Sequence, residues 1–219
     1  MATAGRWRRP ERLYGLLALL ARLVVWLLAD LRVVGAERIP ARGGVLLAAN
    51  HVSFLDPVVL AVALYACGRR KLRFLALADL FNHPLVGWVL RGTRMIPVAR
   101  GRGVARMAED AGAALEAGQA VLVYPEGTIV PPGQTRPARP GAGLVALRAS
   151  VPVLPIASCG VERRRRRRLP PLRRRVTVVV GSPVDLSPWQ GRLDRQAQLE
   201  ASAALLASVQ ALRRDLQGC

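Results

Sequence analysis

The chain has 219 residues, which is room for one sizeable core and little beside it. Apolar residues make up 52% of the chain and charged residues only 21%, which excludes the weakly hydrophobic, highly charged class of disordered proteins. The formal net charge of +19 indicates anionic partners: nucleic acid, anionic lipid headgroups or phosphorylated metabolites. Composition alone does not select among these three.

An apolar run over residues 13–29 follows a basic N-terminal flank. At ~1.5 Å per residue this run reaches about 26 Å, slightly short of the ~30 Å hydrocarbon core of a bilayer. Arg22 interrupts the run, and Asp30 follows it without a small-residue cleavage site, which argues against a cleaved signal peptide. We expect a membrane-seated or interfacial helix with a cytoplasmic N-terminal flank, the alternative being an ordinary buried helix.

Short apolar segments bounded by Gly, Pro or charge alternate with longer amphipathic ones. The short segments are typical of strands: residues 43–49, 72–77, 95–99, 120–124, 151–157 and 176–180. The longer ones predict helices: residues 57–66, 79–90, 104–117, 141–149 and 193–216. This alternation predicts an α/β fold, a single layered domain with a largely parallel or mixed sheet flanked by helices.

The same pattern predicts three consecutive segments. Residues 1–35 form the basic flank and the membrane-associated helix, residues 36–190 the α/β domain, and residues 191–219 a C-terminal helix packed on that domain. Ligands of such sheets bind at the carboxyl ends of the strands.

An arginine-rich tract, Arg163–Arg168 with Arg173–Arg175 beyond it, carries nine arginines against Glu162. A solvated loop between two strands is the simplest interpretation of such a block. Contact with anionic lipid is an alternative. Nucleic-acid binding is less supported, because no aromatic residues are interleaved with the arginines.

Histidine occurs only at His51 and His83, so imidazole chemistry has two candidate bearers. His51 and Asp56 stand where a predicted strand leads into a predicted helix. A carboxylate bonded to the imidazole would fix its tautomer and raise the basicity of the outward nitrogen, although Asp56 before Pro57 is also typical of a plain helix start. His83 precedes a proline, for which we expect a loop or helix-cap role.

A second segment, Pro125-Glu126-Gly127-Thr128, follows a buried strand and by itself is compatible with a tight turn whose Glu126 faces water. Together the two segments resemble the glycerolipid acyltransferase family, the 1-acylglycerol-3-phosphate acyltransferases and their relatives. Asn50-His51 with Asp56 matches the family's N-H-x-x-x-x-D block, and residues 125–128 match the start of its P-E-G-T-R block. Residues 95–100 and 151–156 match two further blocks in the family's order.

The resemblance implies transfer of an acyl group from a thioester to a hydroxyl. The expected acceptor is the lysophospholipid 1-acylglycerol 3-phosphate (lysophosphatidic acid), and the expected donor is acyl-CoA or acyl carrier protein. By the family pattern, His51 is the catalytic base and Asp56 orients it. The residues implied in substrate binding are Asn50, Arg94, Arg100, Glu126, Gly127 and Thr128.

Two positions depart from the family pattern. Ile129 stands where the family has an arginine, and Arg94 stands where it has a glycine. Nearby cations that could replace the missing arginine are Arg136, Arg139 and Arg148. Both departures bear on the acceptor and leave His51 and Asp56 intact.

The sequence carries neither a glycine-rich nucleotide-binding motif nor a C-x-x-C pair, so we expect no nucleotide cofactor, no redox cofactor and no zinc site. Two other functions stay open. One is an acyltransferase for a different acceptor: glycerol 3-phosphate, another lysophospholipid or an aminolipid. The other is a non-catalytic basic protein that binds membranes or nucleic acid. For the enzyme we expect a place at the cytoplasmic face of the cell membrane, against an anionic surface.

Overall fold

The computed structural model describes residues 12–67, 70–99, 103–131, 133–161 and 174–216. Several features singled out from the sequence lie outside these residues: the N-terminal flank over residues 1–11, Arg100, and the tract Arg163–Arg168 with Arg173.

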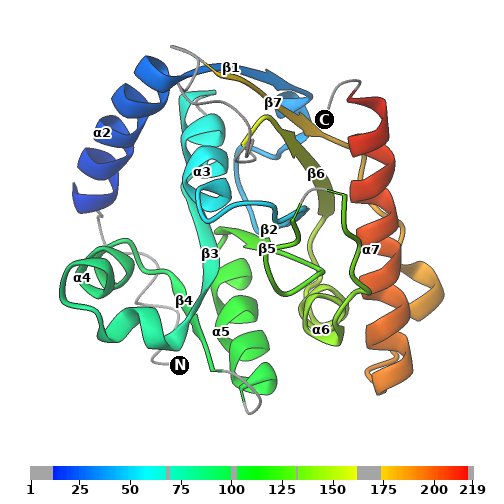
Figure 1. Ribbon diagram of the computed structural model, residues 1–219. Helices are drawn as coiled ribbons and strands as arrows, with labels where there is room; N and C mark the ends of the chain where they lie inside the picture. Colours follow the sequence, from blue (N-terminus) through cyan, green and yellow to red (C-terminus); the bar gives the residue numbers. More distant parts are fainter. Residues whose placement is uncertain (1–11, 68–69, 100–102, 132, 162–173, 217–219) are drawn as a thin grey trace.

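Within the described ranges, seven strands form one sheet in the order β1-β7-β6-β2-β5-β3-β4 (Figure 1). The pair β6 and β7 is antiparallel, and the other neighbouring pairs are parallel. The sheet is therefore mixed and largely parallel, which confirms the predicted fold class. The strands are β1 (Ala29–Val34), β2 (Val45–Ala49), β3 (Leu72–Leu77), β4 (Ile96–Val98), β5 (Ala120–Val123), β6 (Val153–Cys159) and β7 (Arg174–Val180).

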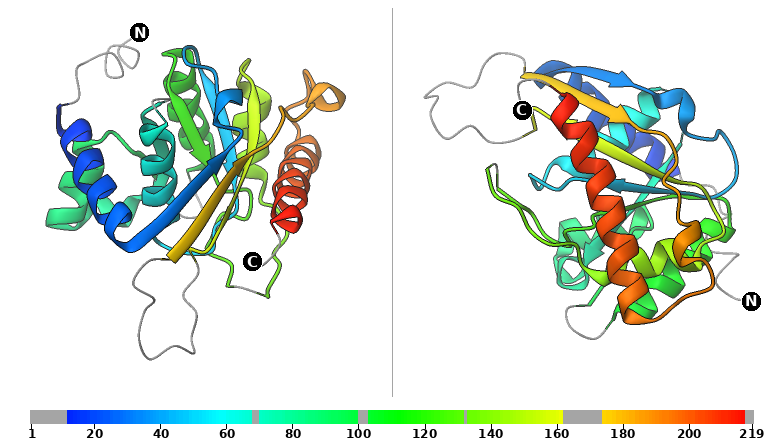
Figure 2. Two further views of the ribbon diagram at one scale, coloured as in Figure 1. Left: turned by 90° about the horizontal axis from the view of Figure 1, so that it is seen from above. Right: turned by 90° about the vertical axis from the view of Figure 1, so that its right-hand side faces the viewer.

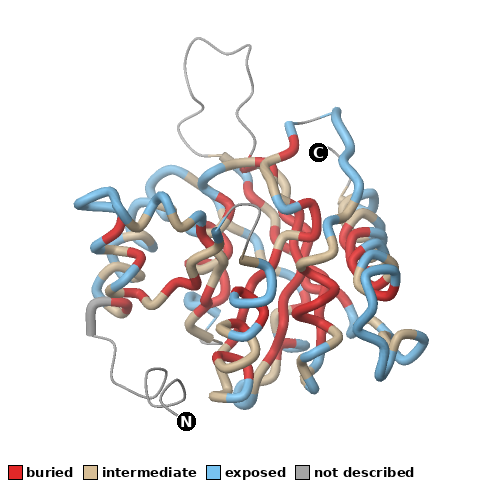
Figure 3. Tube along the Cα trace, turned by 90° about the horizontal axis from the view of Figure 1, so that it is seen from below, coloured by how far each residue is buried: buried red, intermediate tan, exposed pale blue. Residues whose placement is uncertain are grey.

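Helices cover both faces of this sheet, because alternate residues of each central strand point to opposite sides. Leu46 and Ala48 of β2 pack with α5, α6 and α7, whereas Val45 and Leu47 pack with α3. Figure 2 shows the sheet between these two layers, and Figure 3 shows the buried residues concentrated along it. The α-helices are α2 (Arg12–Leu28), α3 (Asp56–Ala66), α4 (Pro84–Gly92), α5 (Val104–Glu116), α6 (Pro140–Arg148) and α7 (Arg195–Asp215), with 3₁₀ turns η1 (Ala36–Arg38), η2 (Ala78–Asn82) and η3 (Ser187–Trp189).

The elements predicted from the sequence are present with ends within two residues, except over residues 79–90. There the structure has η2 and then α4, separated by His83 in an extended conformation. Proline disfavours helical geometry in the residue before it, which explains the break before Pro84. The His83 Nδ1 accepts the backbone N–H of Val86 at 3.3 Å, so the predicted cap role is confirmed.

The strand β1 was not predicted, since residues 29–34 directly follow the apolar run and carry Asp30 and Arg32. Both charged side chains are exposed, and they alternate with half-buried neighbours. That alternation is typical of a strand at the edge of a sheet. β1 pairs with β7, which extends the sheet into the segment assigned to the N-terminal helix.

The helix α2 is tied to the sheet through Tyr14. Its hydroxyl donates to the Leu72 carbonyl at 3.3 Å and accepts the Leu72 N–H at 2.8 Å, and its side chain is buried. Most of the leucines further along α2 are exposed. In the part of the chain that the structure describes, no helix combines the length and the hydrophobicity needed to cross a membrane.

The helices α6 and α7 approach each other closely at Gly143. A Cβ atom at this position would lie 2.0 Å from the Gln198 carbonyl oxygen of α7. Ser202 of α7 accepts the Gly143 N–H at 2.6 Å and donates to the Arg139 carbonyl at 2.7 Å. These contacts fix α7 beside the loop that precedes α6.

Replacing Gly143 by alanine should therefore destabilise the fold by about 1–3 kcal/mol, the usual cost of overpacking. Gly112, inside α5, is the matched control because a Cβ there meets nothing within 4 Å. Gly112→Ala should stabilise the protein by ~0.5–1 kcal/mol through helix propensity. Urea unfolding followed by circular dichroism measures both, and two shifts of the same sign would contradict the close approach.

Candidate active site

The carboxyl ends of β2, β5 and β6 meet at one edge of the sheet, and the first polar groups of the site lie there. Asn50 directly follows β2 and is buried. Its Nδ2 donates to the Ser158 carbonyl at 3.1 Å, while its Oδ1 accepts the Ser158 N–H at 2.8 Å. This reciprocal pair joins the loop after β2 to β6 and fixes where the next residue, His51, begins.

His51 and Asp56 form a hydrogen-bonded dyad. The distance between Nδ1 of His51 and Oδ2 of Asp56 is 3.0 Å. The same Oδ2 accepts the backbone N–H groups of Val52 at 2.6 Å and Ser53 at 2.7 Å. Because Oδ2 of this fully buried carboxylate also accepts two backbone N–H groups, the proton of the neutral imidazole is assigned to Nδ1, which leaves Nε2 as the acceptor nitrogen of His51.

The ring of Tyr124 stacks on the His51 imidazole. Their centroids are 4.0 Å apart and their planes differ by 12°. Burial, and next the negative charge of Asp56, raise the pKa of the Tyr124 hydroxyl well above its ordinary value. Two contacts therefore hold the imidazole: Asp56 at its edge and Tyr124 on its face. Sequence reasoning missed Tyr124, although its place directly before Pro125 at the end of a buried strand was a usable signal.

Glu126 lies beside His51 and does not face open water. Its Oε2 accepts the His51 N–H at 3.1 Å, and only 7% of the residue is exposed. Burial raises the pKa of the Glu126 carboxyl, while the hydrogen bond from His51 and the positive charge of Arg213 oppose that rise. The loops after β2 and β5 meet because the two strands are neighbours in the sheet.

The turn that carries Glu126 is closed by Gly127. Its φ of +64° is in the left-handed region, which glycine adopts without strain, and its N–H donates to the Tyr124 carbonyl at 2.9 Å. A Cβ here would lie 2.7 Å from Cδ of Arg139, so the stem of that arginine covers the turn. Half-buried Thr128 follows, and Val130 then donates its N–H to the His51 carbonyl at 2.7 Å.

The structure brings most of the predicted site residues to one edge: Asn50, His51, Asp56, Glu126, Gly127 and Thr128. It does not bring Arg94 there. Arg94 precedes β4, which is parallel to β3, so it lies toward the amino-terminal edge of the sheet. Arg148, at the end of α6 and ahead of β6, lies toward that opposite edge as well.

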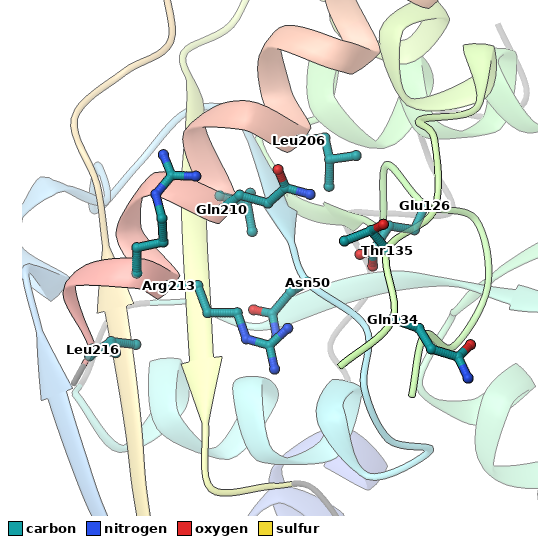
Figure 4. Close-up of a pocket in the computed structure, with 10 residues that line it drawn as sticks. Asn50, Glu126, Gln134, Thr135, Leu206, Gln210, Arg213 and Leu216 are labelled. Carbon is teal, nitrogen blue, oxygen red and sulfur yellow. The ribbon is translucent and has the colours of Figure 1, made fainter. Parts of the chain in front are cut away.

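A pocket of about 410 Å³ adjoins this edge (Figure 4). Asn50 and Glu126 line it from the loops after β2 and β5, and Gln134 and Thr135 line it from the loop before α6. The C-terminal half of α7 and the residue after it line the other side, with Leu206, Val209, Gln210, Arg213, Arg214 and Leu216. No motif in the sequence indicated the contribution of α7. Among the residues the structure describes, no group of three or more His, Cys, Asp or Glu side chains is placed to hold a metal ion.

The carboxyl edge of this α/β sheet thus combines a buried carboxylate, an imidazole bonded to it and a pocket lined by two arginines. The acyltransferase family model matches residues 30–159, more than half of the chain, so the protein belongs to the acyltransferase family.

Individual relatives support the assignment to this family. The chain is 29% identical over 139 residues to the 1-acyl-sn-glycerol-3-phosphate acyltransferase of Borreliella burgdorferi, a match covering 62% of this chain and 54% of the relative. It is 35% identical over 141 residues to the lyso-ornithine lipid O-acyltransferase of Pseudomonas aeruginosa, covering 63% of this chain and 50% of the relative. The chain thus matches about half the length of these relatives.

A solved structure shares the fold. The 1-acyl-sn-glycerophosphate acyltransferase PlsC of Thermotoga maritima superposes with a TM-score of 0.68 at 22% identity, covering 97% of this chain and 85% of that chain.

The raised pKa of Glu126 predicts how the stability of the fold changes with pH. Above about pH 4.3, the ordinary value for Glu, the folded state retains the Glu126 proton that the unfolded state loses, so stability falls as pH rises through the folded pKa. Glu126→Gln keeps an oxygen to accept the His51 N–H and removes the titration. Relative to wild type, this variant should become more stable as pH rises from about 4 to 7, measured as urea midpoints.

Glu200→Gln is the control with the opposite sign. Hydrogen bonds from Gln196 and then Trp189 lower the pKa of the Glu200 carboxyl. The contribution of the Glu200 carboxylate to stability is present at neutral pH and is lost as pH falls. Glu200→Gln should therefore gain stability relative to wild type as pH falls. Parallel pH profiles for the two variants would contradict the assignment for Glu126.

Proposed function

We propose that the protein is an O-acyltransferase that moves a fatty acyl group from a thioester donor to the free hydroxyl of 1-acylglycerol 3-phosphate, giving phosphatidic acid. The observation that carries the proposal is the His51–Asp56 dyad, with Nδ1 bonded to a buried carboxylate, in a chain of the acyltransferase family. The names of several relatives, 1-acyl-sn-glycerol-3-phosphate acyltransferases, support the choice of acceptor.

The reaction needs a base because a hydroxyl is a poor nucleophile at neutral pH. Nε2 of His51 takes the hydroxyl proton as the acceptor oxygen bonds to the thioester carbonyl carbon. The tetrahedral intermediate then collapses, the C–S bond breaks, and the imidazolium returns the proton to the leaving thiolate. Asp56 stabilises the imidazolium through Nδ1, and no acyl-enzyme forms.

Three backbone N–H groups around the base already donate hydrogen bonds to carboxylates. The N–H of His51 donates to Glu126, and those of Val52 and Ser53 donate to Asp56. These three groups hold the base in place, so stabilisation of the oxyanion falls to other donors at this edge. The acyl donor, acyl-CoA or acyl carrier protein, enters as a substrate and the proposed chemistry uses no cofactor.

A second acceptor class has its own support. The 35% identical relative acylates, by its name, a lyso-ornithine lipid, and Ile129 replaces the arginine of the family pattern. A panel of lysophosphatidic acid, lyso-ornithine lipid and glycerol 3-phosphate separates these acceptors, and a preference for a phosphate-free lysolipid would favour the second class.

The two histidines provide a matched test of the base. His51→Ala should reduce acyl transfer by about 10²–10⁴-fold, the usual contribution of a general base. His83→Ala should leave the rate near wild type, because His83 caps α4. The measurement is free-thiol release from oleoyl-CoA, with and without lysophosphatidic acid.

Each result of this assay has a distinct meaning. Thiol release that needs both the acceptor and His51 supports the enzyme and its base. Release without the acceptor would indicate a thioesterase. Wild-type rates in His51→Ala would show that another group is the base. Absence of release from both acyl-CoA and acyl carrier protein thioesters would favour a non-catalytic binding protein.

We further propose that the site is seated on a lipid surface, at the cytoplasmic face where water-soluble thioesters are available. Phe54, within the loop between His51 and Asp56, is 83% exposed, and Leu55 beside it is 60% exposed. The helix α2, which packs on α3, exposes further apolar side chains, among them Leu19, Leu20, Leu23, Trp26, Leu27 and Leu28. An apolar face next to the base allows a lipid acceptor to reach it from the membrane.

Removing two of these side chains tests the membrane seat. Leu23→Ser with Leu27→Ser should weaken binding to phosphatidylethanolamine/phosphatidylglycerol vesicles about tenfold, because each leucine loses apolar area that enters the lipid. Leu199→Ser, at an exposed leucine of α7, is the control. Co-sedimentation with vesicles gives the bound fraction. Equal vesicle binding by the double variant and the Leu199→Ser control would contradict a role for α2.

A further inference from the structure

The pocket between α7 and the sheet edge contains two guanidinium groups from outside the family domain. Arg213 and Arg214 line it from the last turns of α7, whereas the family model matches only residues 30–159. Figure 4 shows α7 side chains on one side, Glu126 and Thr135 on the other, and Asn50 between them. The pocket is therefore lined jointly by the sheet edge that carries the sequence motifs and by α7, which lies outside the matched residues.

The chemistry of the lining suits an anion. The two arginines offer several N–H donors in a planar fork that matches phosphate or carboxylate oxygens. Gln134, Thr135 and Gln210 add amide and hydroxyl groups. Glu126 is the one acid among the described lining residues, and its carboxylate is anchored by the His51 N–H and lies within the electrostatic reach of Arg213.

The position of the pocket connects it to the reaction. Asn50 precedes the base directly, and Glu126 bonds to the backbone of the base, so both lining residues from the sheet contact the His51 segment. Ile129 leaves the neighbouring turn without the arginine of the family pattern. Arg136 and Arg139, which lie close to this turn in sequence, are not among the residues that line the pocket, whereas α7 supplies two arginines that do.

We propose that Arg213 and Arg214 bind the anionic headgroup of the lipid acceptor, a phosphomonoester, in this pocket. The inference rests on the proposed acyltransferase function and adds the site that selects the acceptor. Acyl-CoA also carries phosphate groups, so the same chemistry has a second possible source, and the test must separate the acceptor from the donor.

The test compares two acceptors that differ only in the phosphate. Arg213→Gln and Arg214→Gln should each lower the ratio of kcat/KM for lysophosphatidic acid to that for monoacylglycerol about tenfold, as expected for a lost charge-assisted hydrogen bond. Arg213→Lys, which keeps the charge, should recover part of the ratio. A general structural defect would lower both rates and leave the ratio unchanged.

Arg195→Gln is the matched control. Arg195 is exposed at the first residue of α7, about 27 Å along the helix from Arg213, so its loss removes the same charge without touching the pocket. This variant should keep the wild-type ratio. If Arg195→Gln lowered the ratio of kcat/KM values as much as Arg213→Gln, the effect would reflect general attraction to a basic surface. That result would overturn the proposal.

Two further outcomes would also overturn it. One is an unchanged acceptor ratio in both pocket variants while turnover still depends on His51, which leaves the proposed function standing. The other is a rise in the KM for oleoyl-CoA with an unchanged acceptor ratio, which would assign the pocket to donor phosphates.

A binding measurement keeps the test independent of turnover. Equilibrium dialysis of labelled glycerol 3-phosphate against the wild-type protein, without any donor, should give a Kd that Arg213→Gln raises about tenfold and Arg195→Gln leaves unchanged. If wild type shows no acyl transfer, the proposed function fails, but the binding measurement still tests whether the pocket holds an anion. Equal Kd values for wild type and Arg213→Gln would overturn the anion site.

Discussion

The buried carboxylate of Asp56 organises the whole site. A charge taken out of water is costly unless hydrogen bonds replace its hydration, and here a single oxygen accepts three of them, from the imidazole of His51 and from two backbone N–H groups. Satisfying that oxygen forces the loop after β2 to wrap around the first turn of α3. The orientation of the His51 imidazole is thus a consequence of how α3 docks, and α3 docks because Leu60 and Leu64 pack into the core on that face of the sheet.

The alternation of a β-strand explains why the base and the cationic pocket lie so close and yet are separate. Ala48 packs with the α5, α6 and α7 layer, and Ala49 with the α3 layer. Asn50 continues toward the α7 side and lines the pocket, while His51 turns to the α3 side, where Tyr124 stacks on it. An acceptor whose headgroup is held by α7 therefore crosses the carboxyl end of β2 to present its hydroxyl to His51.

Much of this arrangement could be predicted from the sequence, because its signals are local. Short apolar segments predicted six strands, while the spacing of His51 and Asp56 was compatible with a dyad or a plain helix start, and only the resemblance to the acyltransferase family favoured the dyad. The strand β1 was missed because its exposed Asp30 and Arg32 interrupt the apolar pattern that marks buried strands.

The positions of the cations depend on tertiary structure, which proximity to a motif does not reveal. Arg94 adjoins a matching block and nevertheless lies toward the other edge of the sheet, since β4 is parallel to β3. Arg213 is far from every motif in sequence, and the packing of α7 on α6 at Gly143 carries it to the site. The sequence around Glu126 is compatible with a turn that faces solvent, and only the pairing of β5 with β2 places Glu126 against His51.

Glu126 joins the two halves of the site, and its chemistry suits that place. One of its oxygens holds the backbone of the base, while its charge faces a pocket with two arginines. Burial already favours its neutral form, and a phosphate arriving beside it would favour that form further by repulsion between like charges. A protonated carboxyl still accepts a hydrogen bond through its carbonyl oxygen, so the His51 N–H keeps its partner in either state.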